Sequence, residues 1–347
     1  MTMVRAVRLH GIPNDTRVDL IPGPELTPQG VIVRLAAATV CANDWKTAMR
    51  GSGRAELPCY LGHELAGVVE AVGDRIKEYA PGDRVCIRFA SAIYCGHCYY
   101  CIRGEHNLCE DWQYFNHPAG WVERMYFDER LDERLLHIDE GVSLEAAALV
   151  EPLACSLAGI EMARIPYGEE VVILGAGPMG LFCLQLALLA GAADAIVVDT
   201  VPSRLEIAKV LGATCLVDFK ATDSIAAVKD VTHGRGAASV IECSGSLAGA
   251  EQSIQMVRSR GTVVWFAGFP RPSDLHIDAN TIHYKGIRLT GTSGSTNRHT
   301  HRILAYLRSR RLKVEPIISH RLGFADARQA LELAANQRDA LKIVLRP

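Results

Sequence analysis

VVILGAGPMG, residues 171–180, places an apolar run directly before three glycines. Gly175, Gly177 and Gly180 have the spacing G-x-G-x-x-G, and an apolar segment at 178–190 follows. These runs predict a buried strand before the glycines and a helix after them. In that context the first glycine permits a tight turn, the second lets the backbone approach a pyrophosphate, and the third permits close packing of helix on strand. A glycine turn without a ligand is the alternative, and the flanking strand and helix favour a dinucleotide site.

Apolar strands and helices continue to alternate beyond this motif, whereas the residues before it carry short β-like runs separated by Gly, Pro and Asp turns. Continuous apolar strands joined by helices indicate a parallel sheet that is covered on both faces. The sequence therefore predicts an α/β protein with a mostly β part and a doubly wound parallel sheet. A last segment is too small for a domain and is expected to pack onto one of these parts. Predicted strands lie at 31–35, 67–71, 84–89, 171–174, 195–198, 238–242, 262–266 and 341–345, and predicted helices at 178–190, 203–211 and 299–309.

Asp199 ends the strand that follows the glycine motif and bears on the choice of dinucleotide. A carboxylate there can accept hydrogen bonds from both ribose hydroxyls and would repel a 2′-phosphate, which favours NAD over NADP. Arg204 lies close by in the sequence and could accommodate such a phosphate, so NADP stays open. The first helical turn faces the phosphates with the positive end of the helix dipole. The predicted cofactor-binding residues are Gly175, Gly177, Pro178, Met179, Gly180, Asp199 and Arg204.

Four cysteines, Cys95, Cys98, Cys101 and Cys109, have the spacing C-x₂-C-x₂-C-x₇-C. Four thiolates in one compact loop match a closed tetrahedral zinc site, whose role is structural. An iron–sulfur cluster is the rival, but its usual next spacing is three residues followed by proline, and here it is seven residues followed by Glu110. We predict a structural zinc in a lobe at about residues 90–115.

Composition excludes other classes of function. The chain has 347 residues, which suggests two domains, and its 37 Lys and Arg against 39 Asp and Glu give a net charge of −2. This balance gives no electrostatic case for nucleic acid or an anionic membrane surface. No secretory leader is recognisable, and no apolar stretch reaches the roughly 20 residues that span a bilayer. We expect a cytoplasmic protein that acts on a small molecule.

A second set of possible metal ligands is spread along the chain. Cys41 follows an apolar run, His63 and Glu64 lie in LGHELAG, and Glu151 lies in LVEPLA. A cysteine, a histidine and a carboxylate, with water in the fourth position, suit an open catalytic zinc. Each residue alone has a plainer interpretation, as a small apolar residue or a hydrogen-bonded polar one.

These motifs together resemble the zinc-dependent medium-chain dehydrogenase/reductase superfamily over the whole chain, and within it the sorbitol and threonine dehydrogenase branch. The resemblance rests on the four-cysteine lobe, VVILGAGPMG, GHELAGVVEAVGDRIKEYAPGDRV at 62–85 and EPLACSLAG at 151–159. It implies a GroES-like catalytic domain at 1–152 and 295–347, and a Rossmann domain at 153–294. It also implies a homodimer or homotetramer.

The resemblance assigns roles at the second metal site. Cys41 and His63 would bind the catalytic zinc, and Glu64 often supplies a third ligand in this branch. Glu151 would lie at or just behind the metal, and the two carboxylates would be able to exchange. Asp44 matches the carboxylate that orients the zinc-bound histidine.

Two departures from the family pattern affect the proton path. Asn43 stands where many members have Ser or Thr, and Lys46 stands where the family often has histidine. An amide can hydrogen-bond an alcohol but is a poor proton relay. Glu64, Glu151 or Lys46, acting through water, are the alternatives.

The expected reaction is the oxidation of a secondary alcohol of a polyol-type substrate to a ketone, with two zinc ions per chain and NAD as hydride acceptor. Alternative substrates are an amino alcohol such as threonine, an aminocyclitol or a sugar phosphate. A zinc-free enone or quinone reductase is disfavoured by Cys41, His63 and Asp199 together, and a non-catalytic NAD-binding protein is a further alternative. Candidates for lining the substrate pocket, each with plain packing as an equal alternative, are Trp45, Trp112, Phe115, Trp121 and the hydroxyl run at 292–296.

Overall fold

The computed structural model describes residues 2–51, 56–88, 94–111, 120–128, 131–336 and 340–347. The chain divides into two compact units, which are described separately. The first unit comprises Met1–Pro152 and Ser295–Pro347, and the second comprises Leu153–Gly294. Within the described ranges, no helix combines the length and the apolar character that crossing a bilayer requires.

The second unit is built on a sheet of parallel strands. These strands are β9 (Glu170–Leu174), β10 (Asp194–Asp199), β11 (Cys215–Asp218), β12 (Ala237–Glu242), β13 (Val257–Trp265) and β14 (Arg288–Gly291). Their order is β11-β10-β9-β12-β13-β14, because the chain runs outward from β9 to β11 and then returns to add strands on the other side of β9. Every pairing is parallel, and β12 is buried along its whole length. The predicted doubly wound sheet is confirmed.

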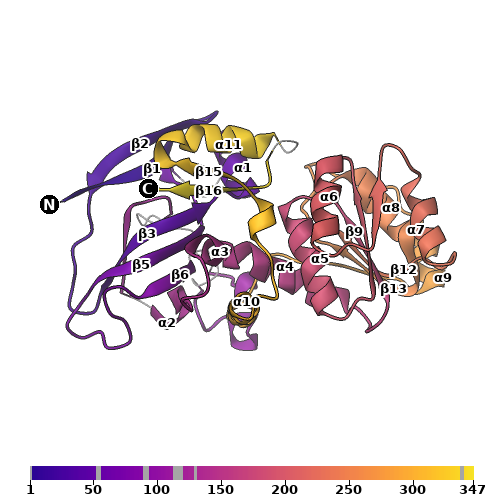
Figure 1. Ribbon diagram of the computed structural model, residues 1–347, viewed down its shortest axis with the longest axis horizontal. Coiled ribbons are helices and arrows are strands. Elements are labelled where there is room, and N and C mark those ends of the chain that lie inside the picture. The colour runs from indigo at the N-terminus through magenta and orange to yellow at the C-terminus, as the bar shows by residue number, and fades with distance from the viewer. Residues whose placement is uncertain (1, 52–55, 89–93, 112–119, 129–130, 337–339) are drawn as a thin grey trace. The chain divides into compact units, whose positions relative to one another are not determined.

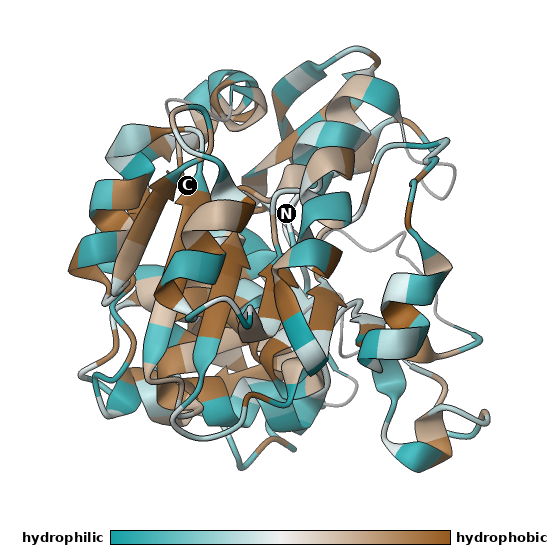
Figure 2. Cartoon of the chain, turned by 90° about the vertical axis from the view of Figure 1, so that its right-hand side faces the viewer, coloured by the Kyte–Doolittle hydropathy of each residue, from teal (hydrophilic) through white to brown (hydrophobic). Residues whose placement is uncertain are grey.

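Helices cover both faces of this sheet. They are α5 (Pro178–Leu189), α6 (Pro202–Val210), α7 (Ser224–Val231), α8 (Leu247–Met256) and α9 (Ala279–Lys285). Figure 1 shows α5 and α6 on one side of the strands and α7 and α8 on the other. In Figure 2 the strands are brown, and the outward surfaces of the helices carry the teal of polar residues. Apolar strands packed between helices that bury apolar residues are thus the physical basis of this unit.

The first unit consists mainly of strands. They are β1 (Met3–Gly11), β2 (Asp15–Pro22), β3 (Val31–Thr39), β4 (Cys59–Tyr60), β5 (Glu64–Val72), β6 (Arg84–Arg88), β7 (Arg124–Phe127), β8 (Leu135–His137), β15 (Ile318–Gly323) and β16 (Lys342–Arg346). One sheet has the order β15-β16-β3-β5-β6-β8, with β7 also paired to β3, and another has the order β2-β1-β4. The predicted strands at 31–35, 67–71 and 84–89 correspond to β3, β5 and β6, and residue 89 lies outside the described ranges.

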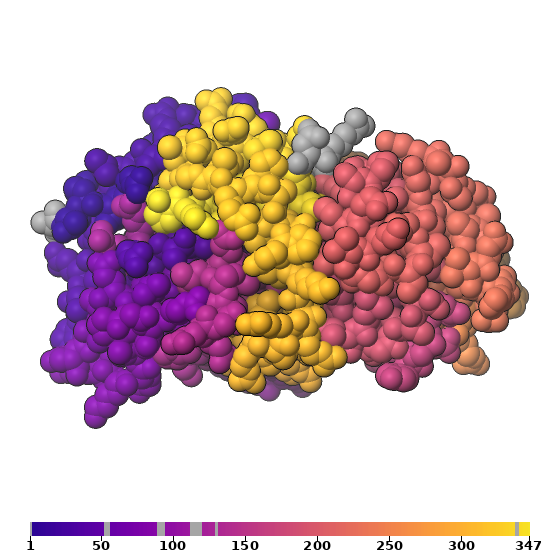
Figure 3. Space-filling view, in the orientation of Figure 1, coloured from indigo at the N-terminus to yellow at the C-terminus, as the bar shows by residue number. Residues whose placement is uncertain are grey.

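The last part of the chain completes this first unit. β16 pairs antiparallel with β3, and the backbone N–H of Val40 donates to the carbonyl of Ile343 at 3.0 Å. Figure 3 shows the C-terminal segment in yellow against the indigo and purple surface of the N-terminal part. Leu35 and Leu345 belong to the same buried apolar cluster. The predicted final strand is therefore confirmed, and it packs onto the first unit.

Short helices connect the strands of the first unit. They are α1 (Ala42–Arg50), α2 (Leu131–Arg134), α3 (Leu144–Ala148), α10 (Asn297–Arg308) and α11 (Ala327–Ala335), with 3-10 turns η2 (Cys101–Arg103), η3 (His106–Leu108), η4 (Glu315–Ile317) and η5 (Phe324–Asp326). One further helix, α4 (Val150–Ala163), begins in the first unit and continues into the second.

Candidate functional site

The start of α1 and the start of β5 bring a first group of chemical side chains together. Cys41 is the N-cap residue of α1, and the Asp44 carboxylate accepts a hydrogen bond from the Cys41 backbone N–H at 2.9 Å. The same carboxylate accepts from the Gly62 N–H at 3.1 Å and lies 3.3 Å from Nδ1 of His63. Asp44 therefore ties the helix cap to the segment directly before β5, which carries Gly62 and His63, in addition to orienting the imidazole ring.

The contact with Asp44 fixes how His63 can act. Because Nδ1 is held by a carboxylate, this nitrogen carries the proton, and Nε2 is left with its lone pair to bind a metal. Burial lowers the pKa of His63, but the negative charges of Asp44 and Cys41 outweigh this effect and raise the pKa well above its usual value. The surroundings of the ring therefore stabilise positive charge at Nε2, which a proton supplies in the metal-free chain and a metal cation would supply when bound.

Glu64 is the third member of this group and is completely buried. Possible ligand atoms of Cys41, His63 and Glu64 all lie within 4.8 Å of one another. A thiolate, an imidazole and a carboxylate at such separations are the donor set of an open zinc site. The residues thus fit a catalytic zinc by their chemistry and their proximity.

Lys342 is a charged residue of this region that sequence reasoning missed. Its ammonium lies 2.6 Å from both carboxylate oxygens of Glu64, and the Thr39 hydroxyl also donates to Glu64. Burial lowers the pKa of Lys342, but Glu64 and Cys41 raise it above its usual value, so the ammonium stays charged. The one available signal was a lysine at the edge of the apolar run Leu341–Leu345, which predicts a strand and says nothing of its partner.

The remaining residues predicted for this site are placed differently. Glu151 lies in the first turn of α4 and, among the described residues, is outside the cluster of ligand atoms that holds Glu64. Its charge still raises the pKa of Lys342, although less than Glu64 does. Asn43 and Lys46 are exposed on α1, whereas Asp44 between them is buried. The structure therefore brings Glu64 rather than Glu151 to Cys41 and His63.

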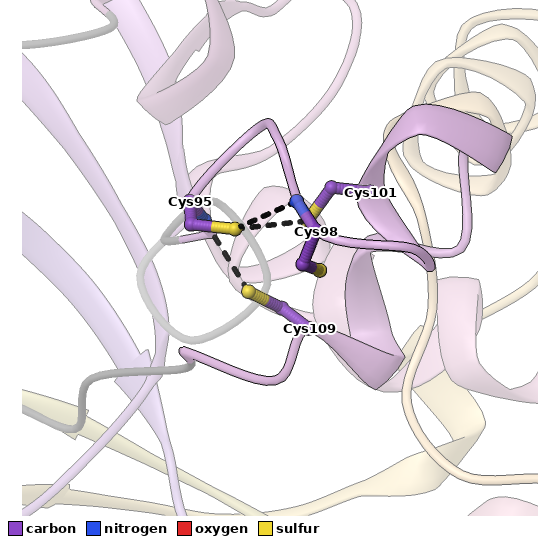
Figure 4. Close-up of side chains that lie close together, drawn as sticks. All are labelled: Cys95, Cys98, Cys101 and Cys109. Atoms are coloured by element: carbon purple, nitrogen blue, oxygen red, sulfur yellow. Dashed lines mark hydrogen bonds between the residues drawn. The ribbon is translucent and has the colours of Figure 1, made fainter.

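The four lobe cysteines lie together, as Figure 4 shows. Their sulfur atoms are all within 4.8 Å of one another, and the Sγ atoms of Cys95 and Cys101 are 3.9 Å apart. Four sulfurs at about 2.3 Å from a central zinc would be separated by about 3.8 Å. The backbone N–H of Cys95 donates to the sulfur of Cys109, and that of Cys98 to the sulfur of Cys95, both at 3.3 Å. Such donors stabilise thiolates, so the cluster fits a closed zinc site.

Within its described residues, 94–111, the lobe around these cysteines has little apolar core of its own. Tyr99, Ile102 and Leu108 are 57%, 67% and 47% exposed, so its large apolar side chains contribute little burial. Backbone N–H groups lower the pKa of the Cys98 thiol to about 6, and burial raises that of Cys101 to about 12. A divalent ion would offset the repulsion among the thiolates and hold the lobe together.

The glycine motif has the geometry of a phosphate-binding turn. Gly175 has φ +97°, and a Cβ there would lie 2.9 Å from the backbone nitrogen of Ser244. A Cβ on Gly180 would lie 1.8 Å from the carbonyl oxygen of Gly175, so helix and strand require glycine. A Cβ on Gly177 would meet nothing nearer than Arg204, at 3.8 Å. No protein atom fills the space directly beside Gly177, so this space fits a pyrophosphate at the N-terminus of α5. Pro178 and Met179 are the first residues of that helix.

Gly177→Ala is expected to leave the fold intact and to weaken dinucleotide binding by about tenfold or more, because the added methyl group occupies the space for the pyrophosphate. Thermal unfolding and NADH fluorescence titration measure the two effects separately. Gly141→Ala, where a Cβ would also meet nothing within 4 Å, is the matched control and should leave both unchanged. Unchanged dinucleotide affinity in Gly177→Ala would argue against this site.

Asp199 and Arg204 lie beside the glycine turn. One carboxylate oxygen of Asp199 accepts from the Ala176 N–H at 2.5 Å, and the other accepts from the Val201 N–H at 2.8 Å. Asp199 and Arg204 are each 9% exposed. The carboxylate is thus fixed at the end of β10, next to a guanidinium group.

The candidates for lining the substrate pocket differ in their burial and placement. Trp121 is fully buried in the apolar core of the first unit, so it packs and does not line a pocket. Trp45 packs partly buried against the same core. Trp112 and Phe115 lie outside the described residues. Within the predicted run of hydroxyl residues at 292–296, Thr296 is the N-cap residue of α10.

Comparisons with known proteins show which family this chain resembles. Residues 27–137 match the alcohol dehydrogenase GroES-like domain, and residues 178–308 match the zinc-binding dehydrogenase family. The sorbitol dehydrogenase of Bacillus subtilis is 28% identical over 99% of this chain and 97% of its own. YdjL of Escherichia coli, an uncharacterised zinc-type alcohol dehydrogenase-like protein, is 32% identical over 94% of this chain and 93% of its own.

Solved structures agree as well. A zinc-binding dehydrogenase of Sinorhizobium meliloti, solved with bound NADP, is 28% identical, has a TM-score of 0.90 and is matched over 100% of both chains. Zinc and a nicotinamide dinucleotide are the cofactors that these matches support, and the residues described above fit both. The chain therefore belongs to the zinc-dependent medium-chain dehydrogenase/reductase family, in its sorbitol dehydrogenase-like branch, and is an oxidoreductase that acts on alcohols.

Proposed function

We propose that this enzyme oxidises a secondary alcohol of a polyol-type substrate to a ketone and transfers the hydride to NAD. The cluster of Cys41, His63 and Glu64 carries the proposal, because three protein ligands leave a fourth position for the substrate oxygen. The similarity to the sorbitol dehydrogenase of Bacillus subtilis supports the substrate class. The two groups of possible ligand atoms support two zinc ions per chain.

Zinc in the first cluster would supply Lewis acidity toward the substrate hydroxyl, and NAD would supply the hydride acceptor. The protein contributes orientation and charge. Asp44 holds the His63 ring with Nε2 available, and the cap of α1 presents the Cys41 sulfur. Asn43 is exposed on α1 and can hydrogen-bond a hydroxyl but does not take up a proton, so the substrate proton would leave through water and one of Glu64, Glu151 or Lys46.

The fixed carboxylate of Asp199 supports NAD as the preferred dinucleotide. Both of its oxygens are held by backbone N–H groups, so the negative charge cannot swing away from an added 2′-phosphate. Its remaining lone pairs can accept from ribose hydroxyls. Arg204 provides a positive charge nearby that would favour the phosphate once the carboxylate is gone.

We therefore expect Asp199→Ser to favour NADP. The ratio of kcat/KM with NAD to kcat/KM with NADP should fall by about tenfold or more. The ratio is measured from initial rates with each dinucleotide. Asp218→Ser is the control, because Asp218 pairs with Asp199 in register at the end of the neighbouring strand. An unchanged ratio in Asp199→Ser would show that Asp199 does not determine the preference between NAD and NADP.

The proposed function is tested by the metal content of the full chain, together with NADH formation over polyols, aminocyclitols, threonine and sugar phosphates. We expect two zinc ions per chain, one for each ligand cluster, and turnover of polyols with a secondary hydroxyl. Turnover confined to threonine or to a sugar phosphate would replace the substrate class and keep the chemistry. One zinc per chain and no turnover of any alcohol would contradict the proposed function.

A further inference from the structure

A positively charged pocket in the first unit has no role in the reaction proposed above. It has a volume of about 330 Å³, and three arginines line it, Arg34, Arg124 and Arg346. Glu123 is the carboxylate side chain among its described lining residues. Neither metal cluster contributes a residue to it. The pocket is therefore a separate feature of this unit.

The pocket borders one edge of β3. Residues 31–34 of β3 pair with β5 on one side and with β7 on the other. Residues 38–39 pair with β5 and, on the side of β7, with β16. The segment between these two pairings lines the pocket through Leu35 and Ala36, and Arg124 and Arg346 reach it from the ends of β7 and β16. Three strands thus direct guanidinium groups to one place.

Two of these arginines stand directly opposite each other. Arg34 of β3 and Arg124 of β7 are partners in the antiparallel register, so their side chains lie on the same face of the sheet. Like charges in directly opposite positions destabilise a sheet. An anion between the two guanidinium groups would replace this repulsion with two charge-assisted interactions.

Both arginines have N–H groups to offer such an anion. Arg34 is exposed, and within the parts of the chain that the structure describes it has no hydrogen-bond or ion-pair partner. Arg124 contacts the two carboxylate oxygens of Glu70 through its Nε, at 2.8 and 3.0 Å, and its Nη groups take no part in these contacts. Guanidinium groups bind phosphate oxygens in a planar, bidentate geometry. The pair therefore suits a phosphoryl group.

The ion pairs around the pocket leave an excess of positive charge. The other carboxylates of this network are Glu70 and Glu145, which pair with arginines of the pocket, and Glu123 pairs with an arginine outside it. The network joins five arginines to three glutamates: Arg5, Arg34, Arg124, Arg321, Arg346, Glu70, Glu123 and Glu145. A terminal carboxylate at Pro347 would offset one of the two excess charges. The pocket thus remains positive in a chain whose net charge is −2.

We propose that this pocket binds a small phosphate monoester, with the phosphoryl group between Arg34 and Arg124 and the organic part against Ala36 and Pro347. The volume lies at the low end of the roughly 300–1,000 Å³ of pockets that hold small molecules, which leaves room for an organic part beside the phosphoryl group. The inference requires neither a metal nor the proposed reaction.

The test is calorimetric titration of the full chain with phenyl phosphate, a monoester without an alcohol group to oxidise. Saturating NADH occupies the glycine turn, so that the probe cannot bind there. Arg34→Gln should raise the Kd of phenyl phosphate by about tenfold. Arg34→Lys, which keeps the charge and loses the planar fork, should have an intermediate Kd. Arg75→Gln makes the same change at another exposed arginine of the first unit and should bind as the wild type does.

Thermal unfolding gives a second reading of the opposed charges. At low salt and without phosphate, Arg34→Gln should raise the unfolding midpoint by about 1–2 °C, because Arg124 no longer faces a like charge. Phenyl phosphate should raise the midpoint of the wild type and have a smaller effect on Arg34→Gln. A residue that only supported the fold would lower the midpoint when replaced.

The outcomes bear on the pocket alone. Undiminished binding of phenyl phosphate in Arg34→Gln, or no binding to the wild type, would overturn the site. Equal affinity of the wild type for inorganic phosphate and phenyl phosphate would overturn the monoester as its ligand. Zinc content and alcohol turnover should be the same in Arg34→Gln and the wild type, so the proposed function stands or fails independently.

Discussion

His63→Ala should reduce kcat by on the order of 10³-fold or more while NADH still binds, because the variant removes a ligand of the metal that polarises the substrate. Cys41→Ala should do the same. In both variants the zinc content should fall from two per chain to one, since the cysteine lobe is untouched. Initial rates, metal analysis and NADH fluorescence titration give the three readings on the same preparation.

Two control variants keep this result interpretable. Cys59→Ala removes a free thiol of the first unit outside the metal cluster, and His283→Ala removes an exposed histidine of α9. Both should retain two zinc ions and full turnover. Near wild-type activity in His63→Ala or Cys41→Ala would mean that the reaction does not use a metal at this position.

Cys101→Ser should separate the second metal from catalysis. Loss of one of four thiolates should release the lobe zinc and lower the midpoint of thermal unfolding by about 5–10 °C, because the lobe has little apolar burial to replace it. Proteases should then cut within the lobe first. The zinc at the Cys41 cluster should remain, so zinc content again falls from two per chain to one while turnover persists at reduced stability.

Cys215→Ala, which removes a half-buried free thiol of the second unit, is the control for this variant. It should leave the zinc content and the protease pattern unchanged. Iron and inorganic sulfide in the wild-type lobe would contradict the zinc assignment and restore the iron–sulfur alternative.

How far the sequence predicts this molecule depends on how close in the chain the cooperating residues are. The turn at Gly175, Gly177 and Gly180 is contiguous, and its chemistry follows from the local order of strand, glycine and helix. The cysteine lobe is contiguous in the same way. Both could be predicted from spacing alone. The parallel sheet of the second unit could be predicted as well, because its strands are continuous apolar runs.

The Cys41 cluster shows where this approach stops. Cys41 and His63 come from different elements, and without the resemblance to a family each has a plainer interpretation. Lys342 lies 278 residues after Glu64 and reaches it because β16 pairs with β3, a pairing that no local pattern contains. The choice of Glu64 over Glu151 as the neighbour of Cys41 and His63 likewise depends on tertiary packing.

The pairing of β16 with β3 also sets an order of events during synthesis. Cys41, His63 and Glu64 leave the ribosome long before Lys342, and the whole second unit is made in between. At about 5–20 residues per second, the 278 positions that separate Glu64 from Lys342 take roughly 15–55 seconds. During that interval the nascent chain carries the ligands without the ammonium that pairs with Glu64. The three ligands are therefore made before the partner of Glu64 exists, and this buried carboxylate gains its ammonium only when the C-terminal strand docks.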